Sequence, residues 1–236
     1  MQVMDERVGI KSQSPVSGRP SMVGVIGGTG PLGRGLASRL AAAGHQVRIG
    51  SRDPNRAEEA AALLGERITG ASNAEVCASD LVVIAVPWPA HEQTIMQLRD
   101  ELDGRIVIDC VNPLGFDERG PFALSVDAGS AAQQAQQLLP NSTVVGAFHH
   151  VSAELLLDGG DLDTDVLVLG DDRGAVDQVI ALADSITGLR GVFAGRLRNV
   201  GQVEALTANL IAVNRRYRVQ SGIRVAGLPP LSDPGH

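Results

Sequence analysis

Hydrophobic positions in the first two thirds of this chain alternate between short strand-like runs and stretches with helical spacing. Residues 22–26, 46–50, 81–86 and 105–109 are the clearest strand-like runs. The run at 81–86 is apolar at every position and is followed by Pro87, which is typical of a parallel strand covered on both faces. Such alternation predicts an α/β fold with a doubly wound parallel sheet, in which ligands bind at the carboxyl ends of the strands.

The same pattern sets the boundaries of the expected elements. Strands are expected at 22–26, 46–50, 67–69, 81–86, 105–109, 143–147 and 165–169. Helices are expected after the first strand, and at 54–64, 73–78, 90–102, 131–139, 175–186 and 201–217, with a loop at 111–126. The alternation changes after about residue 150, which predicts a smaller C-terminal α/β domain.

The expected division of the chain has four parts. Residues 21–148 form a Rossmann-type dinucleotide-binding domain, and residues 149–228 form the small C-terminal domain. Residues 1–20 mix Ser, Gln, Gly, Pro and charges without periodicity, and residues 229–236 are rich in proline. We expect both of these ends to be flexible tails.

A glycine-rich loop follows the first predicted strand. Gly28, Gly30 and Gly33 fit the pattern G-x-G-x-x-G, and Leu36 and Leu40 continue as one face of a helix. Glycine permits the tight turn, the approach of backbone amides to a pyrophosphate, and the packing of helix on strand. The helix N-terminus adds free N–H groups and the positive end of its dipole. This context favours a dinucleotide site over a merely structural glycine-rich turn.

The residues after the second strand predict which dinucleotide binds. NAD-specific folds usually have Asp or Glu about 20 residues past the glycines, to accept from the ribose 2′-hydroxyl. This chain has Ser51 and Arg52 there, with Arg56 one helical turn further, and these groups suit a 2′-phosphate. Asp53 is explained as the N-cap before Pro54. The alternative is that both arginines are simply solvated, but the missing carboxylate favours NADP.

Composition excludes several other classes of protein. The chain of 236 residues has 3% aromatic residues and a net charge of −7, which argues against a nucleic-acid-binding surface. Cys77 and Cys110 make neither a disulfide framework nor metal-ligand spacing, so no metal site is expected. The first 20 residues lack the apolar core of a secretory signal, and the longest apolar run is too short to span a membrane. We therefore expect a cytoplasmic protein.

Several single residues allow two interpretations. Trp88 directly follows a strand's carboxyl end, which favours a ligand contact over a place in the core. His149 and His150 follow the strand at 143–147 and are interpreted as packed pocket residues, with proton donation as the alternative. His91 is interpreted as solvated. The apolar stripe of the last helix (Val203, Leu206, Leu210 and Val213) is either domain core or a subunit interface.

These residues together resemble one known family. The stretches Ile26-Gly27-Gly28-Thr29-Gly30-Pro31-Leu32-Gly33, Gly50-Ser51-Arg52 and Val86-Pro87-Trp88 are similar to those of NADPH:coenzyme F420 oxidoreductases. Near the C-terminus, Val203-Glu204-Ala205-Leu206-Thr207 and Asn209-Leu210-Ile211 resemble that family's last helix. The resemblance covers residues 22–228. It implies an NADPH-dependent oxidoreductase that transfers a hydride between NADP(H) and a deazaflavin, coenzyme F420.

The resemblance also implies roles for individual residues. Those that hold the pyrophosphate are Thr29, Gly30, Pro31 and Leu32, and Gly28 before them is a further cofactor-binding residue. Those that hold the 2′-phosphate are Ser51, Arg52 and Arg56. Those near the ribose and nicotinamide are Pro87, Trp88 and Asn112. Those near the stacked deazaflavin are His149 and Ala153 at the domain junction, and Ile223 through its backbone.

The chain departs from the family's pattern in three places: Asp109-Cys110, the loop at 111–130, and the basic segment 214–218. Coenzyme F420 has a phosphate and a polyglutamate tail. Arg215, Arg216 and Arg218 are therefore a candidate counter-charge for that tail on an otherwise acidic protein.

The implied chemistry needs no protein nucleophile, acid, base or metal, because the two cofactors supply the reacting atoms. We nominate no catalytic side chain. One alternative is an NADPH-dependent reductase of another acceptor, such as a flavin or a small carbonyl compound. Another is a non-catalytic protein that senses NADP(H). Partners are expected to be these small molecules and a second copy of the chain in a homodimer, without nucleic acid or membrane.

Overall fold

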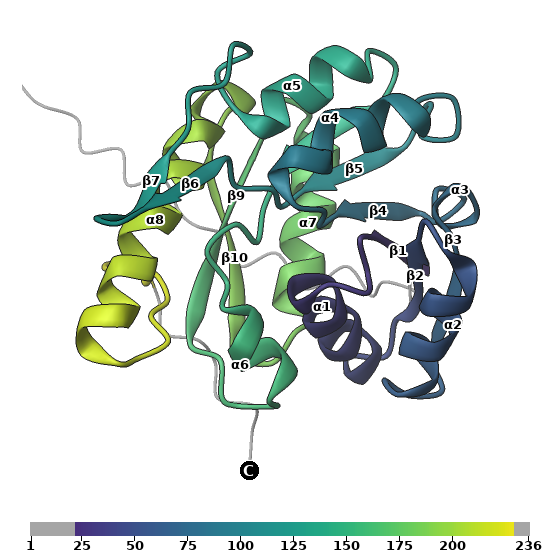
Figure 1. The fold of residues 1–236 in the computed structure, drawn as a ribbon, viewed down its shortest axis with the longest axis horizontal. Helices are drawn as coiled ribbons and strands as arrows, with labels where there is room; N and C mark the ends of the chain where they lie inside the picture. Colours follow the sequence, from purple (N-terminus) through teal and green to yellow (C-terminus); the bar gives the residue numbers. More distant parts are fainter. Residues whose placement is uncertain (1–21, 229–236) are drawn as a thin grey trace, which may run out of the picture.

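A computed structural model describes residues 22–228, and its centre is a single eight-stranded sheet (Figure 1). The strands, in chain order, are β1 (Met22–Ile26), β2 (Gln46–Ser51), β3 (Ile68–Ser72), β4 (Leu81–Ile84), β5 (Ile106–Asp109), β8 (Thr143–Gly146), β9 (Thr164–Gly170) and β10 (Leu189–Gly195). They lie side by side in the order β10-β9-β8-β5-β4-β1-β2-β3. The predicted tails at 1–20 and 229–236 lie outside the described residues.

Helices connect the strands and cover both faces of the sheet. They are α1 (Pro31–Ala42), α2 (Pro54–Ala62), α3 (Asn73–Val76), α4 (Trp88–Gln97), α5 (Ala131–Leu138), α6 (Ala153–Leu157), α7 (Arg173–Asp184) and α8 (Val200–Tyr217), with a 3-10 turn at Leu197–Asn199. One buried cluster joins the sheet to α1 and α7, and a second joins its other face to α4 and α5. Helices on both faces are the mark of the doubly wound class, which confirms the predicted fold.

Pairing within the sheet is parallel everywhere except at one seam. From β3 to β8 each strand runs parallel to its neighbour, and β9 and β10 are parallel to each other. The antiparallel contact between β8 and β9 has only two residue pairs, Val145 with Gly170 and Gly146 with Leu169. The sheet therefore continues past the predicted boundary at 148/149, and the division into two domains stays a prediction.

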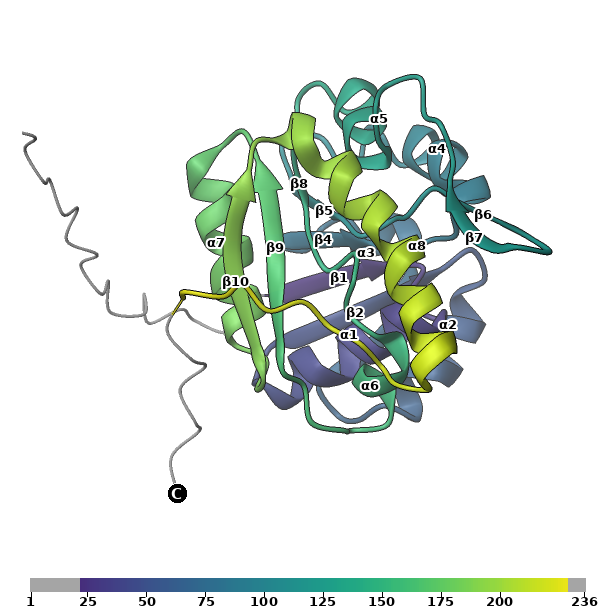
Figure 2. The ribbon, with the colours of Figure 1, turned by 90° about the vertical axis from the view of Figure 1, so that its left-hand side faces the viewer.

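The observed elements correct the predicted ones in four places. The predicted loop at 111–126 contains a hairpin, β6 (Leu114–Asp117) and β7 (Gly120–Ala123), which packs beside α8 (Figure 2). The strand β10 and the short helix α6 were not predicted. The helix expected at 90–102 begins earlier, at Trp88, and ends at Gln97. Among the described residues no helix is both long and apolar enough to span a membrane.

Candidate functional site

The glycine loop lies between the ends of three neighbouring strands. The amide of Gly28 donates to the carbonyl of Gly50 at 3.2 Å, which fixes the loop against β2. A Cβ on Gly28 would lie 2.5 Å from the Cβ of Ile49, and one on Gly33 would lie 2.6 Å from the carbonyl oxygen of Gly27. Real Cβ atoms do not approach so closely, so neither position accepts a side chain without a shift of the loop. The sequence therefore needs glycine here for close packing, as predicted.

The first turn of α1 offers unpaired donors to an anion. Its N-cap is Gly30, so no side chain caps the first backbone N–H groups of the helix. Pro31 is the first helical residue and Leu32 the second. The first-turn amides of a helix have no intrahelical acceptor, and the helix dipole is positive at this end. Thr29 is half-buried beside this turn. The loop residues predicted to hold the pyrophosphate thus form a cradle of glycines under a free helix N-terminus, which fits a diphosphate.

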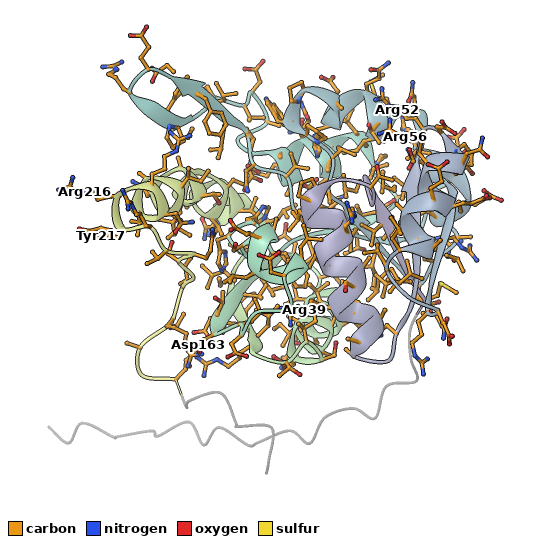
Figure 3. All side chains as sticks on the ribbon, turned by 60° about the horizontal axis from the view of Figure 1, so that its bottom comes forward. Arg39, Arg52, Arg56, Asp163, Arg216 and Tyr217 are labelled. Atoms are coloured by element: carbon orange, nitrogen blue, oxygen red, sulfur yellow. The ribbon has the colours of Figure 1, made fainter. Side chains whose placement is uncertain are left out.

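The residues predicted to hold the 2′-phosphate lie together at the carboxyl end of β2. Ser51 is the last residue of that strand, and Arg52 and Arg56 are both exposed. Figure 3 shows the two arginines beside each other on one side of the molecule. The Asp53 carboxylate accepts from the amide of Asn55 at 3.1 Å, so it is engaged in capping α2 as predicted.

The end of β4 leads directly into α4. Pro87 is the exposed N-cap of that helix and Trp88, half-buried, is its first residue. A Cβ on Gly27 would lie 3.0 Å from Cγ1 of Val86, so the glycine loop and this strand end are in contact. Trp88 is therefore at the carboxyl edge next to the glycine loop, where a Rossmann fold binds its ligand.

His91 is not solvated, and the prediction for this residue is wrong. It is fully buried, with Nε2 2.7 Å from Oδ2 of Asp109 and Nδ1 3.0 Å from Oε1 of Gln134. Burial alone would lower the pKa of His91, but the charge and hydrogen bond of Asp109 raise it above its ordinary value. The contacts that bury it come from β5 and α5, which lie 18 and 43 residues further along the chain.

Asn112 and His149 meet after β5 and β8. The Asn112 amide donates to the carbonyl of His149 at 2.8 Å, and the hydroxyl of Thr207 on α8 donates to the same carbonyl at 3.2 Å. The Oδ1 atom of Asn112 is buried and has no hydrogen-bond partner among the described residues. An unpaired buried acceptor at the strand edge fits a ligand amide as donor.

The His149 imidazole is packed rather than poised for proton transfer. It is 3% exposed, and neither ring nitrogen has a hydrogen-bond partner among the described residues. Burial lowers the pKa of His149 to about 4, so the ring is neutral near pH 7. His150 is also buried and donates through Nε2 to the carbonyl of Asp165 at 2.7 Å. Both histidines thus have the packed environment that was favoured over proton donation.

Ala153 begins α6, which packs on α1 close to the glycine loop. Arg39 of α1 donates to the carbonyls of Leu155, Leu156 and Gly160, at 2.5–3.0 Å. The side of α6 also touches α1 at Gly35, where a Cβ would lie 2.6 Å from the Cβ of Leu156. One guanidinium therefore holds the α6 segment against the helix that offers its N-terminus to the pyrophosphate.

Ile223 lies in the segment after α8, which runs back past α6 and then crosses β9 and β10 (Figure 2). Its carbonyl accepts from the amide of Asp165 at 2.8 Å. Earlier in this segment, Gln220 accepts from the hydroxyl of Ser152 at 3.0 Å, next to Ala153. The segment thus connects the residues around Ala153 to the sheet. The Ile223 carbonyl, which is a predicted backbone contact to the deazaflavin, already accepts a hydrogen bond from Asp165.

The predicted basic cluster is at the C-terminal end of α8. Arg215, Arg216 and Arg218 are exposed, and Figure 3 shows Arg216 at the opposite side of the molecule from Arg52. Arg215 and Arg218 line an open hollow of about 410 Å³ together with Glu154 of α6. None of the three arginines has a salt bridge to another described residue.

Comparisons with known proteins agree with this geometry. A family model described as NADP oxidoreductase, coenzyme F420-dependent, matches residues 22–113. The F420-dependent NADP reductase of Methanothermobacter thermautotrophicus is 38% identical over 88% of this chain and 95% of its own length. That of Methanocaldococcus jannaschii is 36% identical over 87% of this chain and 98% of its own. A crystal structure described as an F420-dependent NADP-reductase from an Arthrobacter species has a TM-score of 0.75 and 27% identity, covering 88% of this chain and all of that one.

Proposed function

Because this chain belongs to the family of coenzyme F420-dependent NADP oxidoreductases, we propose that it transfers a hydride between NADP(H) and coenzyme F420. The single observation that supports this most is the extent of the similarity, which covers nearly the whole of each archaeal reductase rather than its dinucleotide fold alone. When bound, the nicotinamide and deazaflavin rings supply the hydride donor and acceptor.

The residues at the carboxyl edge have distinct tasks in this proposal. The glycine cradle and the first turn of α1 bind the pyrophosphate with backbone amides. Ser51, Arg52 and Arg56 bind the 2′-phosphate and select NADP(H) over NAD(H), because a guanidinium and a hydroxyl suit a phosphate and the nearby Asp53 caps α2. Trp88 and Asn112 hold the nicotinamide end, with the unpaired Oδ1 of Asn112 as an acceptor for a carboxamide N–H.

The remaining site residues orient the second ring and exclude water. Ala153 presents a small side chain at the start of α6, and Ile223 lies in the segment that crosses it. His149 contributes packing and its carbonyl, which Asn112 and Thr207 fix in place. No side chain needs to give or take a proton during hydride transfer itself, so the protein acts by orientation of the two rings.

The direct experiment is to add NADPH to purified protein with F420 and to record the loss of deazaflavin absorbance. FMN, FAD and small carbonyl compounds serve as alternative acceptors. Reduction of F420 at a far higher kcat/KM than of the others is the expected result. Reduction of another acceptor instead would support the alternative reductase, and NADPH binding without turnover of any acceptor would support a sensor.

The preference for NADP is tested at Arg52. Arg52→Ala removes a guanidinium from the 2′-phosphate, and loss of one charge-assisted hydrogen bond is expected to raise the KM for NADPH by about 10- to 100-fold. The KM for NADH should remain unchanged. Equal increases for both nucleotides would contradict the assignment of Arg52 to the 2′-phosphate.

We assign the acidic tail of F420 to Arg215, Arg216 and Arg218. Support comes from their exposure without salt bridges among the described residues, and from the hollow that Arg215 and Arg218 share with Glu154, the neighbour of Ala153. Replacement of all three arginines by Gln should raise the KM for F420 and leave that for NADPH unchanged. Equal effects on both values would refute the assignment.

We further propose a homodimer and a cytoplasmic location. Exposed large apolar residues gather on two adjacent elements: Phe116 and Phe122 on the β6–β7 hairpin, and Leu206, Val213 and Tyr217 on α8. Such a concentration of exposed apolar side chains favours burial by a second copy. Light scattering of the wild type and of Val213→Glu tests the dimer. The buried free thiols of Cys77 and Cys110 are consistent with a reducing compartment.

A further inference from the structure

Behind Trp88 lies a buried polar cluster to which no role has yet been given. It consists of His91 from α4, Asp109 from β5, Gln134 from α5 and Glu204 from α8. His91 and Asp109 have no exposed surface, and Glu204 is 2% exposed. Charged groups are rarely buried unless they are paired, so four elements converge here on one electrostatic unit.

His91 has an acceptor at each ring nitrogen. The Asp109 carboxylate is 2.7 Å from Nε2, and the Gln134 amide oxygen is 3.0 Å from Nδ1. An imidazole with two acceptors donates from both nitrogens, which is the imidazolium form. The two hydrogen bonds lie on opposite sides of the ring and leave it no freedom to rotate.

His91 lies against one predicted cofactor contact, Trp88, and Asp109 holds the residue before another, Asn112. The His91 ring lies 5.5 Å from the Trp88 ring, centroid to centroid, with a tilt of 33°. The second oxygen of Asp109 accepts from the amide of Val111 at 3.0 Å, which fixes the chain immediately before Asn112. A cation near an indole ring is attracted to its π face, so the pair holds Trp88 as well as the loop.

We propose that the buried His91–Asp109 pair positions Trp88 and Asn112 for the nicotinamide, and that both act as positioning residues rather than catalytic ones. This inference rests on the proposed function, because it takes Trp88 and Asn112 as nicotinamide contacts. Asp109 acts on Trp88 through the His91 ring and on Asn112 through the Val111 amide. A hydrocarbon core would fill the same volume but would not fix the orientation of the ring, because its contacts are not directional.

Other titratable groups face the pair from two sides. Glu204 of α8 accepts from the amides of Ala131 and Ala132 at the start of α5, and His149 is buried after β8. His149 is neutral, as described above, so it adds no competing positive charge. Glu204 and Asp109 therefore both favour the protonated form of His91.

The test uses Trp88 itself, since it is the only tryptophan of the chain. In Asp109→Asn, His91 keeps a hydrogen-bond partner but loses the anion that most favours its protonated form. A protonated imidazole quenches nearby indole emission, and we expect brighter Trp88 fluorescence and a changed response to saturating NADPH. We expect kcat for F420 reduction to fall about 10- to 100-fold, with the KM for NADPH changed by less than about threefold.

Ser142→Ala is the matched control. It removes a buried hydrogen bond, from the Ser142 hydroxyl to the carbonyl of Leu102 at 2.7 Å, at the opposite end of β8 from the site. It should lower stability without changing Trp88 emission or kcat. If Asp109→Asn does not fold, His91→Gln replaces it, because its carboxamide can still donate to Asp109 while the ring next to Trp88 is lost.

The outcomes separate this inference from the proposed function. Equal losses of kcat in Asp109→Asn and Ser142→Ala, or an unchanged Trp88 signal in both Asp109→Asn and His91→Gln, would overturn the positioning role. A wild type that binds NADPH but does not reduce F420 would overturn the proposed function instead. In that case the response of Trp88 emission to NADPH still decides whether the pair positions this ring.

Discussion

Glu204 allows a quantitative test of the buried cluster through protein stability. Its two carboxylate oxygens accept from the amides of Ala131 at 2.9 Å and Ala132 at 3.1 Å, which caps α5 from the side of α8. Burial raises the pKa of Glu204 from 4.5 to about 7, although the two amides oppose the rise. Near pH 7 this carboxyl therefore holds a proton far more often in the folded protein than in the unfolded chain.

The direction and size of the effect follow from linkage. A group with a raised pKa in the folded state makes unfolding release a proton, so the free energy of unfolding falls as the pH rises between the two values. One pKa unit corresponds to about 1.36 kcal/mol, so the rise from 4.5 to about 7 makes Glu204 contribute about 3 kcal/mol to the free energy of unfolding at low pH. Between about pH 5 and about pH 8, roughly 2–3 kcal/mol of this should be lost.

The variant Glu204→Gln removes the titration but keeps the shape and one acceptor oxygen. At about pH 5 its free energy of unfolding should match that of the wild type within about 1 kcal/mol. The protonated acid and the carboxamide each keep one acceptor oxygen, and each points a donor group at the other of the two backbone N–H groups. At about pH 8 the variant should be more stable than the wild type, by roughly 2 kcal/mol. Urea unfolding followed by circular dichroism at several pH values gives the difference.

Comparison at each pH cancels the contributions of all other groups, including that of His149. Exposed Glu66→Gln is the control, and its difference from the wild type should not change with pH. A difference between Glu204→Gln and wild type that stays constant from about pH 5 to about pH 8 would refute the reasoning. A difference of the opposite sign would mean that the amides and His91 stabilise the ionised carboxylate more than burial disfavours it.

Three further predictions concern the cofactor edge. Gly33→Ala places a Cβ 2.6 Å from the carbonyl oxygen of Gly27, so we expect the free energy of unfolding in urea to fall by about 1–3 kcal/mol. NADPH should also bind more weakly in a fluorescence titration, and unchanged binding would contradict the assignment of the pyrophosphate to the glycine loop. Asp53→Ala removes the cap of α2 and should cost about 1 kcal/mol, measured by the urea midpoint, with NADP still preferred over NAD. Burial lowers the pKa of His149 to about 4, so its NMR signal should remain that of a neutral ring at pH 6, and its contribution to stability should be lost as the pH falls from about 6.5 to about 4.

The periodic parts of the chain were predictable because local pattern and tertiary structure agree there. The strand predicted at 81–86 is present as Leu81–Ile84, where every position is buried, and the helix after Gly30 is present with its apolar residues on one face. The cap at Asp53 was also predictable, since a carboxylate followed by proline has one well-defined use. The edge of the sheet at which a ligand is expected follows from the alternation of strands and helices, which makes the strands parallel.

The parts that were missed depend on contacts distant in the sequence. His91 is buried by Asp109 and Gln134, which are 18 and 43 residues away, while its neighbours Glu92 and Gln93 are exposed. The hairpin at 114–123 exposes both its phenylalanines, so its strands have no buried face and no apolar alternation to detect. In β10, Gly191 and Gly195 interrupt the run of residues that would otherwise predict a strand.

The seam between β8 and β9 has a mechanical consequence. Every other neighbouring pair in the eight-stranded sheet is joined by at least four residue pairs, and this one by two. The stiffness of a sheet across its strands comes from its ladder of hydrogen bonds, so bending concentrates where the ladder is shortest. His149 and Ala153 lie in the connection that follows β8. A rotation about this seam would therefore change the separation between the glycine loop and the start of α6 only where the packing of α6 on α1 also yields.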